Sequence, residues 1–350
     1  MRGYLLLFLQ LCGPKSSAMK RFLFRILLLV VTVFFFSSWG FLVHRTIHQL
    51  AVYELPGEMR PFFYKNMNYL VENAGRPDQR RNQDSTEASK HFIDLEAFGD
   101  SAAWKMPFKW EDAVAVFTKD SLLEYGYVPY HIITMKNKLT GAFRSLQKDS
   151  ILFYATDLAH YIGDANVPLH TSLNYDGQLT NQHGLHSLWE SMVPEIEIEH
   201  YNLYSHHKAS YLKNPAQTVW DCIRRAHSLL PGVFGKEIQA TIGFTDSMKF
   251  RVQTRRGKEV KSYTSGFAKA YSQLLGQTIN DQLLHSASMI SDFWYTAWVD
   301  AGKPDLSGII SNFQQQDKEA LKAEQKAWKR NELIKNKVLI SRIQAPQQQP

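Results

Sequence analysis

The chain has 350 residues, enough for one large domain or two small ones, and 44% of them are hydrophobic, which is enough to fill a core. The formal net charge is +7, but residues 1–38 hold five basic and no acidic residues, and residues 315–350 hold eight basic and four acidic ones. The other 27 Lys and Arg residues are matched by 29 Asp and Glu residues, so composition gives no support to a broad basic surface for nucleic acid.

The first 38 residues are typical of a secretory signal peptide. A basic stretch that begins at Met19 is followed by an apolar run over 26–36 and then by Ser37 and Ser38. The run is shorter than the roughly 20 apolar residues of a membrane span. We therefore expect 1–38 to be a signal peptide, with Met19 as an alternative start, and the protein to be exported to the periplasm or secreted. It would be membrane-anchored if the signal were not cleaved.

Two cysteines are present, Cys12 and Cys222. Cys12 lies in the segment that we expect to be removed, which leaves Cys222 without a partner. Disulfide bonds are therefore not expected to stabilise the mature fold.

From residue 39 onward the spacing of apolar residues is mainly helical. It predicts a helix over 41–55, ended by Pro56 and Gly57. Further helices are predicted over 58–74, 111–147, 150–166, 184–192, 214–230, 262–280 and 281–300. Polar segments at 76–110 and 171–183 are predicted to be irregular, and 245–262 to be a loop or hairpin. We therefore expect an all-α fold, with a single mainly helical domain over 39–303.

The C-terminal segment, 304–350, has a different composition. Residues 315–336 are charged and helix-prone but show no clear apolar stripe, so we expect a solvated helix. Residues 344–350 are a polar, low-complexity tail that we expect to be disordered. The sequence thus predicts a C-terminal extension rather than a second domain.

Histidines and carboxylates between residues 160 and 190 form the strongest chemical signal. His160 and Asp164 are four residues apart on a predicted helix, so both lie on one face. His186 and Glu190 repeat this spacing on the next helix, and His170 lies between the two pairs. Because imidazole and carboxylate groups are good zinc ligands, the pattern predicts a zinc site rather than a network of salt bridges.

Together with motifs nearer the N-terminus, these residues resemble the superfamily of zinc-dependent phospholipases C and S1/P1-type single-strand nucleases. The matching motifs occur in the family's order and lie within 39–190, a little under half of the chain. They are Trp39-Gly40-x-x-x-His44, Asp78-x-x-Arg81, His91-Phe92-Ile93-Asp94, His160-x-x-x-Asp164-x-x-x-x-Pro168-Leu169-His170 and His186-x-x-x-Glu190.

The resemblance implies a catalytic cluster of three zinc ions. A first ion would be held by Asp78, His91, His160 and Asp164. A second would be held by His170, His186 and Glu190. A third would be bound by His44, Asp164 and the amine and carbonyl of Trp39. Asp164 would thus bridge two ions, and the signal peptide would have to be removed at Trp39 to complete the cluster.

The resemblance also implies a helical fold of the phospholipase C/P1 nuclease type and a hydrolytic reaction. Metal-activated hydroxide would attack phosphorus, because zinc lowers the pKa of bound water. Asp78 would orient the nucleophile, and Arg81 would neutralise charge on the phosphoryl oxygens. In the nuclease branch, Phe92 would stack on a base and Asp94 would bond its edge.

The sequence leaves the substrate open. Arg81, Phe92 and Asp94 favour an S1/P1-like nuclease that acts on single-stranded nucleic acid. Glu190 replaces the aspartate usual in the nucleases and favours a phospholipase C that acts on phospholipid head groups. An alternative of another class is a non-catalytic, zinc-stabilised binding protein. We infer a phosphate-ester substrate and no protein partner, and we expect a monomer.

Overall fold

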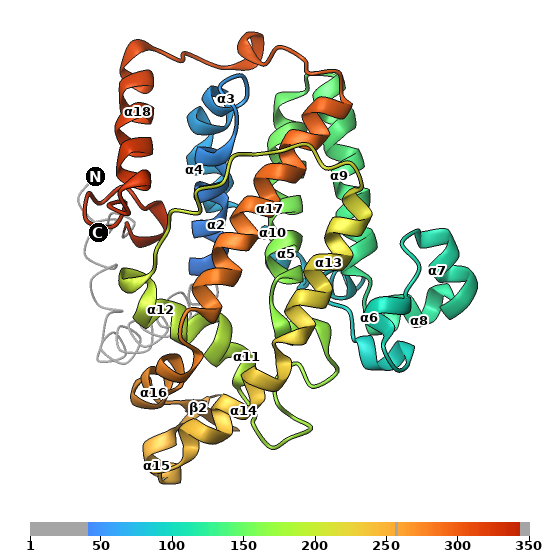
Figure 1. Ribbon diagram of the computed structural model, residues 1–350, viewed down its shortest axis with the longest axis vertical. Coiled ribbons are helices and arrows are strands. Elements are labelled where there is room, and N and C mark those ends of the chain that lie inside the picture. Colours follow the sequence, from blue (N-terminus) through green and yellow to red (C-terminus); the bar gives the residue numbers. More distant parts are fainter. Residues whose placement is uncertain (1–40, 256–257, 344–350) are drawn as a thin grey trace, which may run out of the picture. The chain divides into compact units, whose positions relative to one another are not determined.

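The computed structural model describes residues 41–255 and 258–343, and these residues are mainly helical, as expected (Figure 1). The signal peptide, the start at Met19 and the ligand Trp39 lie outside the described residues. From Phe41 on, the chain forms one compact unit. Within the described ranges, no helix is both long and apolar enough to cross a bilayer.

The helical elements follow one another closely along the chain. The α-helices are α2 (Phe41–Glu54), α3 (Arg60–Lys65), α4 (Met67–Glu72), α5 (Arg76–Arg80), α6 (Ala102–Lys105), α7 (Trp110–Phe117), α8 (Lys119–Tyr125), α9 (Val128–Arg144), α10 (Lys148–Ala165), α11 (Leu185–Ser187), α12 (Val193–Glu197), α13 (Pro215–Ser228), α14 (Leu230–Thr241), α15 (Asp246–Lys249), α16 (Ser265–Leu275), α17 (Thr278–Asp300) and α18 (Gln315–Lys329). A π-helical turn, η4, covers Leu188–Met192. Short 3₁₀ helices are η1 (Ala88–Lys90), η2 (Leu95–Phe98), η3 (Pro168–Thr171), η5 (Ile198–His200), η6 (Ser307–Ile309) and η7 (Ile340–Arg342).

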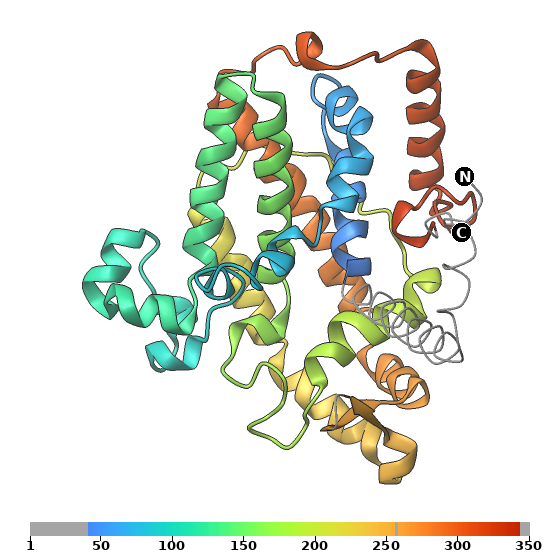
Figure 2. The ribbon, with the colours of Figure 1, turned by 180° about the vertical axis from the view of Figure 1, so that it is seen from behind.

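Long helices α2, α9, α10 and α17 pack together and enclose the core (Figures 1 and 2). Helix α10 contacts the other three, and 13 of its 18 residues are buried. At its centre the Trp294 indole of α17 donates to the Ala155 carbonyl at 3.0 Å and stacks on Phe63 with ring centroids 4.7 Å apart. Because most of α10 is buried, its buried carboxylates, Asp157 and Asp164, must be paired or bound to a ligand.

Several predicted helices are interrupted where the backbone leaves the right-handed region. The single helix expected over 111–147 is wrong: Thr118 has φ +66° and Gly126 has φ +88°, and these residues separate α7, α8 and α9. The helix expected over 58–74 is divided at Asn66 into α3 and α4. Helix α14 was not predicted, and short helices occupy part of the segment expected to be irregular, 76–110.

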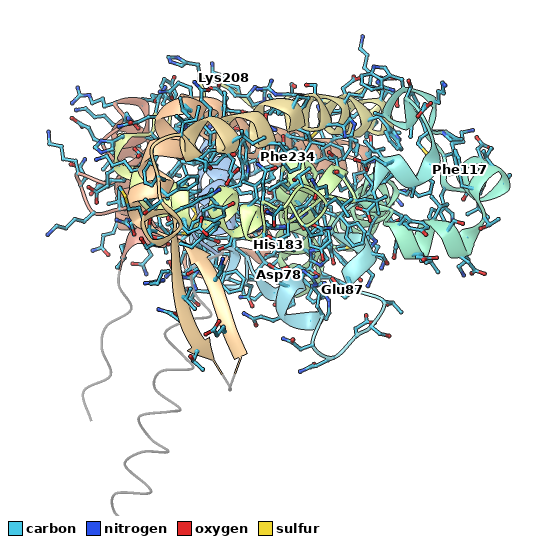
Figure 3. All side chains as sticks on the ribbon, turned by 90° about the horizontal axis from the view of Figure 1, so that it is seen from below. Asp78, Glu87, Phe117, His183, Lys208 and Phe234 are labelled. Atoms are coloured by element: carbon cyan, nitrogen blue, oxygen red, sulfur yellow. The ribbon has the colours of Figure 1, made fainter. Side chains whose placement is uncertain are left out.

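Residues 250–263 form the hairpin that was one of two predicted possibilities. Strands β1 (Phe250–Arg255) and β2 (Lys258–Tyr263) are antiparallel, with Phe250 opposite Tyr263. The strands extend away from the helices in Figure 3. The buried Tyr263 anchors the base of the hairpin, because its hydroxyl donates to Glu237 of α14 at 2.9 Å.

The C-terminal segment packs on the same core, which corrects the expectation of a solvated helix. Helix α18 ends at Lys329 and buries Leu321, Ala327 and Trp328. The Trp328 indole donates to the Leu203 carbonyl at 2.7 Å, and Tyr53 of α2 donates to Glu324 at 2.7 Å. The apolar residues of α18 are too few to form an evident stripe, yet they include one large aromatic side chain. The tail at 344–350 lies outside the described residues.

Candidate metal centre

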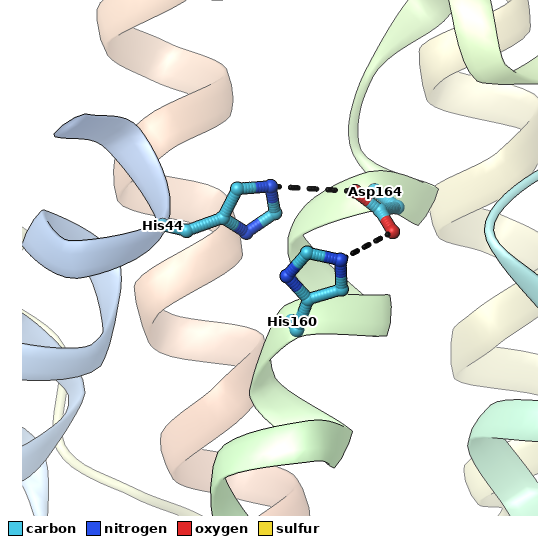
Figure 4. A group of neighbouring side chains, drawn as sticks. All are labelled: His44, His160 and Asp164. Atoms are coloured by element: carbon cyan, nitrogen blue, oxygen red, sulfur yellow. Dashed lines mark ion pairs between the residues drawn. The ribbon is translucent and has the colours of Figure 1, made fainter. Parts of the chain in front are cut away.

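Asp164 lies at the centre of the candidate site, one helical turn after His160 on α10 (Figure 4). Its Oδ1 is 3.4 Å from Nε2 of His44 on α2, and its Oδ2 is 3.3 Å from Nε2 of His160. Both histidines and Asp164 are buried. The two oxygens of one carboxylate therefore face different donors, as is required of a ligand that bridges two ions.

Helix α2 approaches α10 this closely because residue 163 is glycine. A Cβ at Gly163 would lie 2.8 Å from Cδ1 of Ile47 and 3.0 Å from Cε1 of His44. Both distances are shorter than an ordinary carbon–carbon contact of about 3.5 Å or more. The glycine thus allows His44 to reach Asp164 and to stack on His160, with ring centroids 4.2 Å apart.

The four residues expected at the first zinc converge in the structure. His91 Nδ1 is 2.8 Å from Asp164 Oδ2, 3.2 Å from His160 Nε2 and 3.6 Å from Asp78 Oδ1. His160 Nε2 is 3.8 Å from the same Asp78 oxygen. A tetrahedral zinc ion with bonds of about 2.0–2.1 Å separates its ligand atoms by roughly 3.3 Å. The donor set therefore fits zinc in both chemistry and spacing.

The three residues expected at the second zinc form a separate group with similar spacing. His170 Nε2 is 3.2 Å from His186 Nε2 and 3.2 Å from Glu190 Oε1. His186 Nε2 is 2.7 Å from Glu190 Oε2. Each of the three side chains offers one ligand atom, and these atoms lie within 4.8 Å of one another. Glu190 lies in a π-helical turn, a distortion that is frequent at functional sites.

Backbone carbonyls orient two of the imidazoles. His160 Nδ1 is 2.8 Å from the Ala74 carbonyl, and His170 Nδ1 is 2.8 Å from the His91 carbonyl. A carbonyl can only accept, so in neutral histidine each Nδ1 carries the proton. The lone pair of each Nε2 is then directed at the cluster, which is the arrangement common in metal sites.

Protonation equilibria in the site leave His160 and Asp164, but not His170, in the forms that bind metal. Burial lowers the pKa of His160 to about 4, so its imidazole is neutral at pH 7. Burial alone would raise the pKa of Asp164, but His160, His44 and His91 together hold it well below its usual range. Asp164 therefore stays ionised. Burial opposes protonation of His170, yet Glu190 and Asp164 raise its pKa to about 9, so a metal ion that bound there would displace a proton.

Asp78 and Arg81, the expected catalytic pair, lie at the open edge of the cluster. The Asp78 side chain is 35% exposed and the Arg81 side chain 49%, and an Arg81 guanidinium nitrogen is 3.7 Å from Asp78 Oδ1. The neighbouring Arg80 instead pairs with Asp157 at 2.9 Å and Glu87 at 3.0 Å. Of the two adjacent arginines, Arg81 is therefore the more exposed, and Arg80 is the one held by buried carboxylates.

The two residues expected to bind substrate follow His91 directly. The Phe92 ring packs against Gly126, where a Cβ would lie 2.6 Å from the ring, and Phe92 is only partly buried. Asp94 is buried, and burial together with Glu96 raises its pKa to about 7. This carboxyl group therefore keeps its proton to a higher pH than an ordinary aspartate does.

The loop over 171–184 brings His186 to the second group. Asp176 accepts the backbone N–H groups of Gly184 at 3.1 Å and His186 at 3.3 Å. Gln182 donates to the buried Glu237 of α14 at 2.6 Å. These bonds hold the residues immediately before His186 and so fix the position of this candidate ligand.

Sequence reasoning missed the buried ion pairs that lie beneath the first group. Glu87 and Asp157 are both buried and bind Arg80, and Asp157 also binds Arg76. A signal was present, because Glu87 and His91 have the same four-residue spacing as His160 and Asp164. No prediction was made from that pair.

Comparisons with known proteins add no assignment: no family model matches the chain, and no curated protein matches it.

Proposed function

We propose that this protein is a zinc-dependent hydrolase of phosphate esters, with the fold of the phospholipase C/P1 nuclease type. The observation that carries the proposal is the pair of converging donor groups around Asp164 and Glu190, with Asp164 shared between His44 and His160. A merely structural zinc site closes its coordination with four protein ligands. The second group offers three, which leaves a position for water or substrate.

Three zinc ions fit the proposal. The first would be held by Asp78, His91, His160 and Asp164, the second by His170, His186 and Glu190, and the third by His44, Asp164 and Trp39. When bound, zinc activates water as a nucleophile at neutral pH and polarises the phosphoryl oxygen. Asp78, partly exposed beside the first group, would accept a hydrogen bond from the attacking water and orient it. Arg81, close to Asp78, would bind the phosphoryl oxygens.

The substrate that we propose is single-stranded nucleic acid. Phe92 and Asp94 lie on the segment that begins at His91, so a base bound there would adjoin the metal cluster. The raised pKa of Asp94 supports this proposal, because a neutral carboxyl group can both donate to and accept from a base edge. It also repels a phosphodiester less than a carboxylate would.

Phospholipid is the second candidate substrate, and one structural observation favours it. Leu179 and Tyr175 are exposed on the loop that leads to His186, and the Tyr175 ring lies 6.4 Å from the His186 ring. Exposed apolar side chains beside a phosphoesterase site would contact acyl chains at a lipid surface. Glu190 agrees with this candidate too.

Metal analysis and turnover assays test the proposal together. The mature protein, loaded with zinc, would be incubated with single-stranded DNA, RNA and phosphatidylcholine. We expect three zinc ions per chain and cleavage of a nucleic acid. Asp164→Asn should bind fewer ions and lose activity, whereas Asp221→Asn, an exposed control, should retain both. Zinc without turnover of any ester would favour a non-catalytic binding protein.

The export proposal has its own measurement. We propose that the mature chain is an exported monomer that begins at Trp39, so that its free amine can bind the third zinc. N-terminal sequencing of protein from the native host should read Trp-Gly-Phe. A blocked N-terminus ahead of Trp39, or fewer than three zinc ions, would contradict the trinuclear site.

A further inference from the structure

Glu87 is a buried carboxylate beside the first donor group and is not among the expected ligands. Its side chain is 1% exposed, and it accepts hydrogen bonds from Arg80 at 3.0 Å, Lys90 at 2.6 Å and the Tyr161 hydroxyl. Two cations and a hydroxyl thus converge on this carboxylate and hold it in place.

His91 turns its other ring nitrogen toward this carboxylate. His91 Nδ1 faces the ligand atoms of the first group, whereas Nε2 is buried and makes no hydrogen bond within the described part of the chain. Glu87 Oε1 lies 3.6 Å from that Nε2, slightly beyond hydrogen-bond distance.

The partners of Glu87 come from the three segments that carry the first group. Arg80 is on α5, two residues after Asp78, and Tyr161 follows His160 on α10. Lys90 precedes His91. Figure 3 shows Asp78 and Glu87 in the same light-blue segment, which runs from α5 toward η1. Glu87 thus ties the ligand-bearing segments together from behind the site.

We propose that Glu87 is a positioning residue for the first zinc ion, acting through His91. A zinc ion bound at Nδ1 of His91 leaves the ring proton on Nε2. Glu87 accepts that N–H, fixes the orientation of the ring and increases the basicity of Nδ1. Carboxylates that bind a zinc-ligating histidine in this way typically change metal affinity about 10–100-fold. The inference rests on the proposed zinc site but concerns a residue outside it.

Paired variants separate this role from a structural one. Glu87→Gln keeps the size of the side chain and removes its charge. Asp157→Asn does the same in the adjoining ion pairs, since Asp157 shares Arg80 with Glu87 and has no contact with His91. Zinc affinity would be measured by competition with a chelator of known affinity, and stability by thermal unfolding.

We expect both variants to unfold at a lower temperature, but only Glu87→Gln to bind the first zinc about 10–100-fold more weakly. The second zinc, at Glu190, should be unchanged in both. Equal loss of affinity in both variants, or no loss in Glu87→Gln, would overturn the proposal. A wild-type chain that binds no zinc would instead refute the proposed function.

The wild-type protein offers a test that does not depend on a variant folding. In zinc-loaded protein with ¹⁵N-labelled histidine, the His91 Nε2 proton should resonate downfield and exchange slowly with solvent, because a carboxylate accepts it. A zinc-loaded protein in which His91 shows no such proton would overturn the role of Glu87.

Discussion

Replacement of Gly163 by alanine perturbs the contact between α2 and α10 at the metal centre. The added Cβ would lie 2.8 Å from Ile47 Cδ1 and 3.0 Å from the His44 ring. His44 is confined by its stack on His160, so the ring can move only away from α10. We expect this movement to lengthen the 3.4 Å distance between His44 Nε2 and Asp164 Oδ1.

The size of the effect follows from the clash. To restore ordinary van der Waals distances, the clashing atoms must move apart by about 0.5–1 Å. Overpacking of this kind lowers the free energy of unfolding by about 1–3 kcal/mol. Alanine recovers about 1 kcal/mol through its higher helix propensity. The variant should therefore be destabilised by roughly 0–2 kcal/mol. Metal–ligand distances tolerate only about 0.2 Å, so the site that includes His44 should lose its zinc.

Gly141→Ala is the matched control, because Gly141 is also helical, on α9, and a Cβ there would have no atom within 4 Å. It should be stabilised by about 1 kcal/mol and keep its full zinc content. Zinc per chain would be measured by elemental analysis after gel filtration, and stability by urea unfolding. If Gly163→Ala retained the same zinc content and affinity as Gly141→Ala, the reasoning about helix approach would be refuted.

Two further predictions concern parts of the fold away from the ligands. Trp328→Ala should destabilise the protein by about 3–5 kcal/mol, because a buried indole and its hydrogen bond to the Leu203 carbonyl are lost. Urea unfolding measures this change. A loss of stability below about 1 kcal/mol would contradict the packing of α18 on the core. Burial raises the pKa of Glu54 from 4.5 to about 7, against hydrogen bonds from Ser205 and Ser291. The unfolded chain therefore ionises first, so the free energy of unfolding should fall as pH rises from 4.5 to 7, and Glu54→Gln should flatten this decline in urea titrations across that range. An unchanged slope would show that Glu54 ionises normally.

Helix boundaries were predicted well where helix-breaking residues, such as proline and glycine, set them. Pro56 and Gly57 end the first helix close to where α2 ends, because neither residue continues a helix well. The breaks at Thr118 and Gly126 were missed, because threonine seldom adopts a positive φ; Thr118 is exposed, and its hydroxyl caps α8 by accepting the Ser121 N–H. Glycine is required at position 126, because a Cβ there would lie 2.3 Å from the Phe92 carbonyl oxygen.

The sequence by itself determined the helical class and named residues of the candidate metal centre. Residues four apart on a helix share a face, so His160 with Asp164 and His186 with Glu190 could be paired before any fold was known. This information is local: it depends on helix geometry and on the chemistry of imidazole and carboxylate groups.

Which distant segments meet was implied by the family resemblance alone, and only the tertiary structure decided it. It brings His44, Asp78 and His91 to Asp164, and it places Glu87 behind His91. These contacts span long stretches of chain and depend on close helix packing, such as that at Gly163. Contacts between distant segments leave no periodic pattern in the sequence. Even local spacing does not settle a role, because a side chain four residues from a candidate ligand can face the metal site, a buried ion pair or the core.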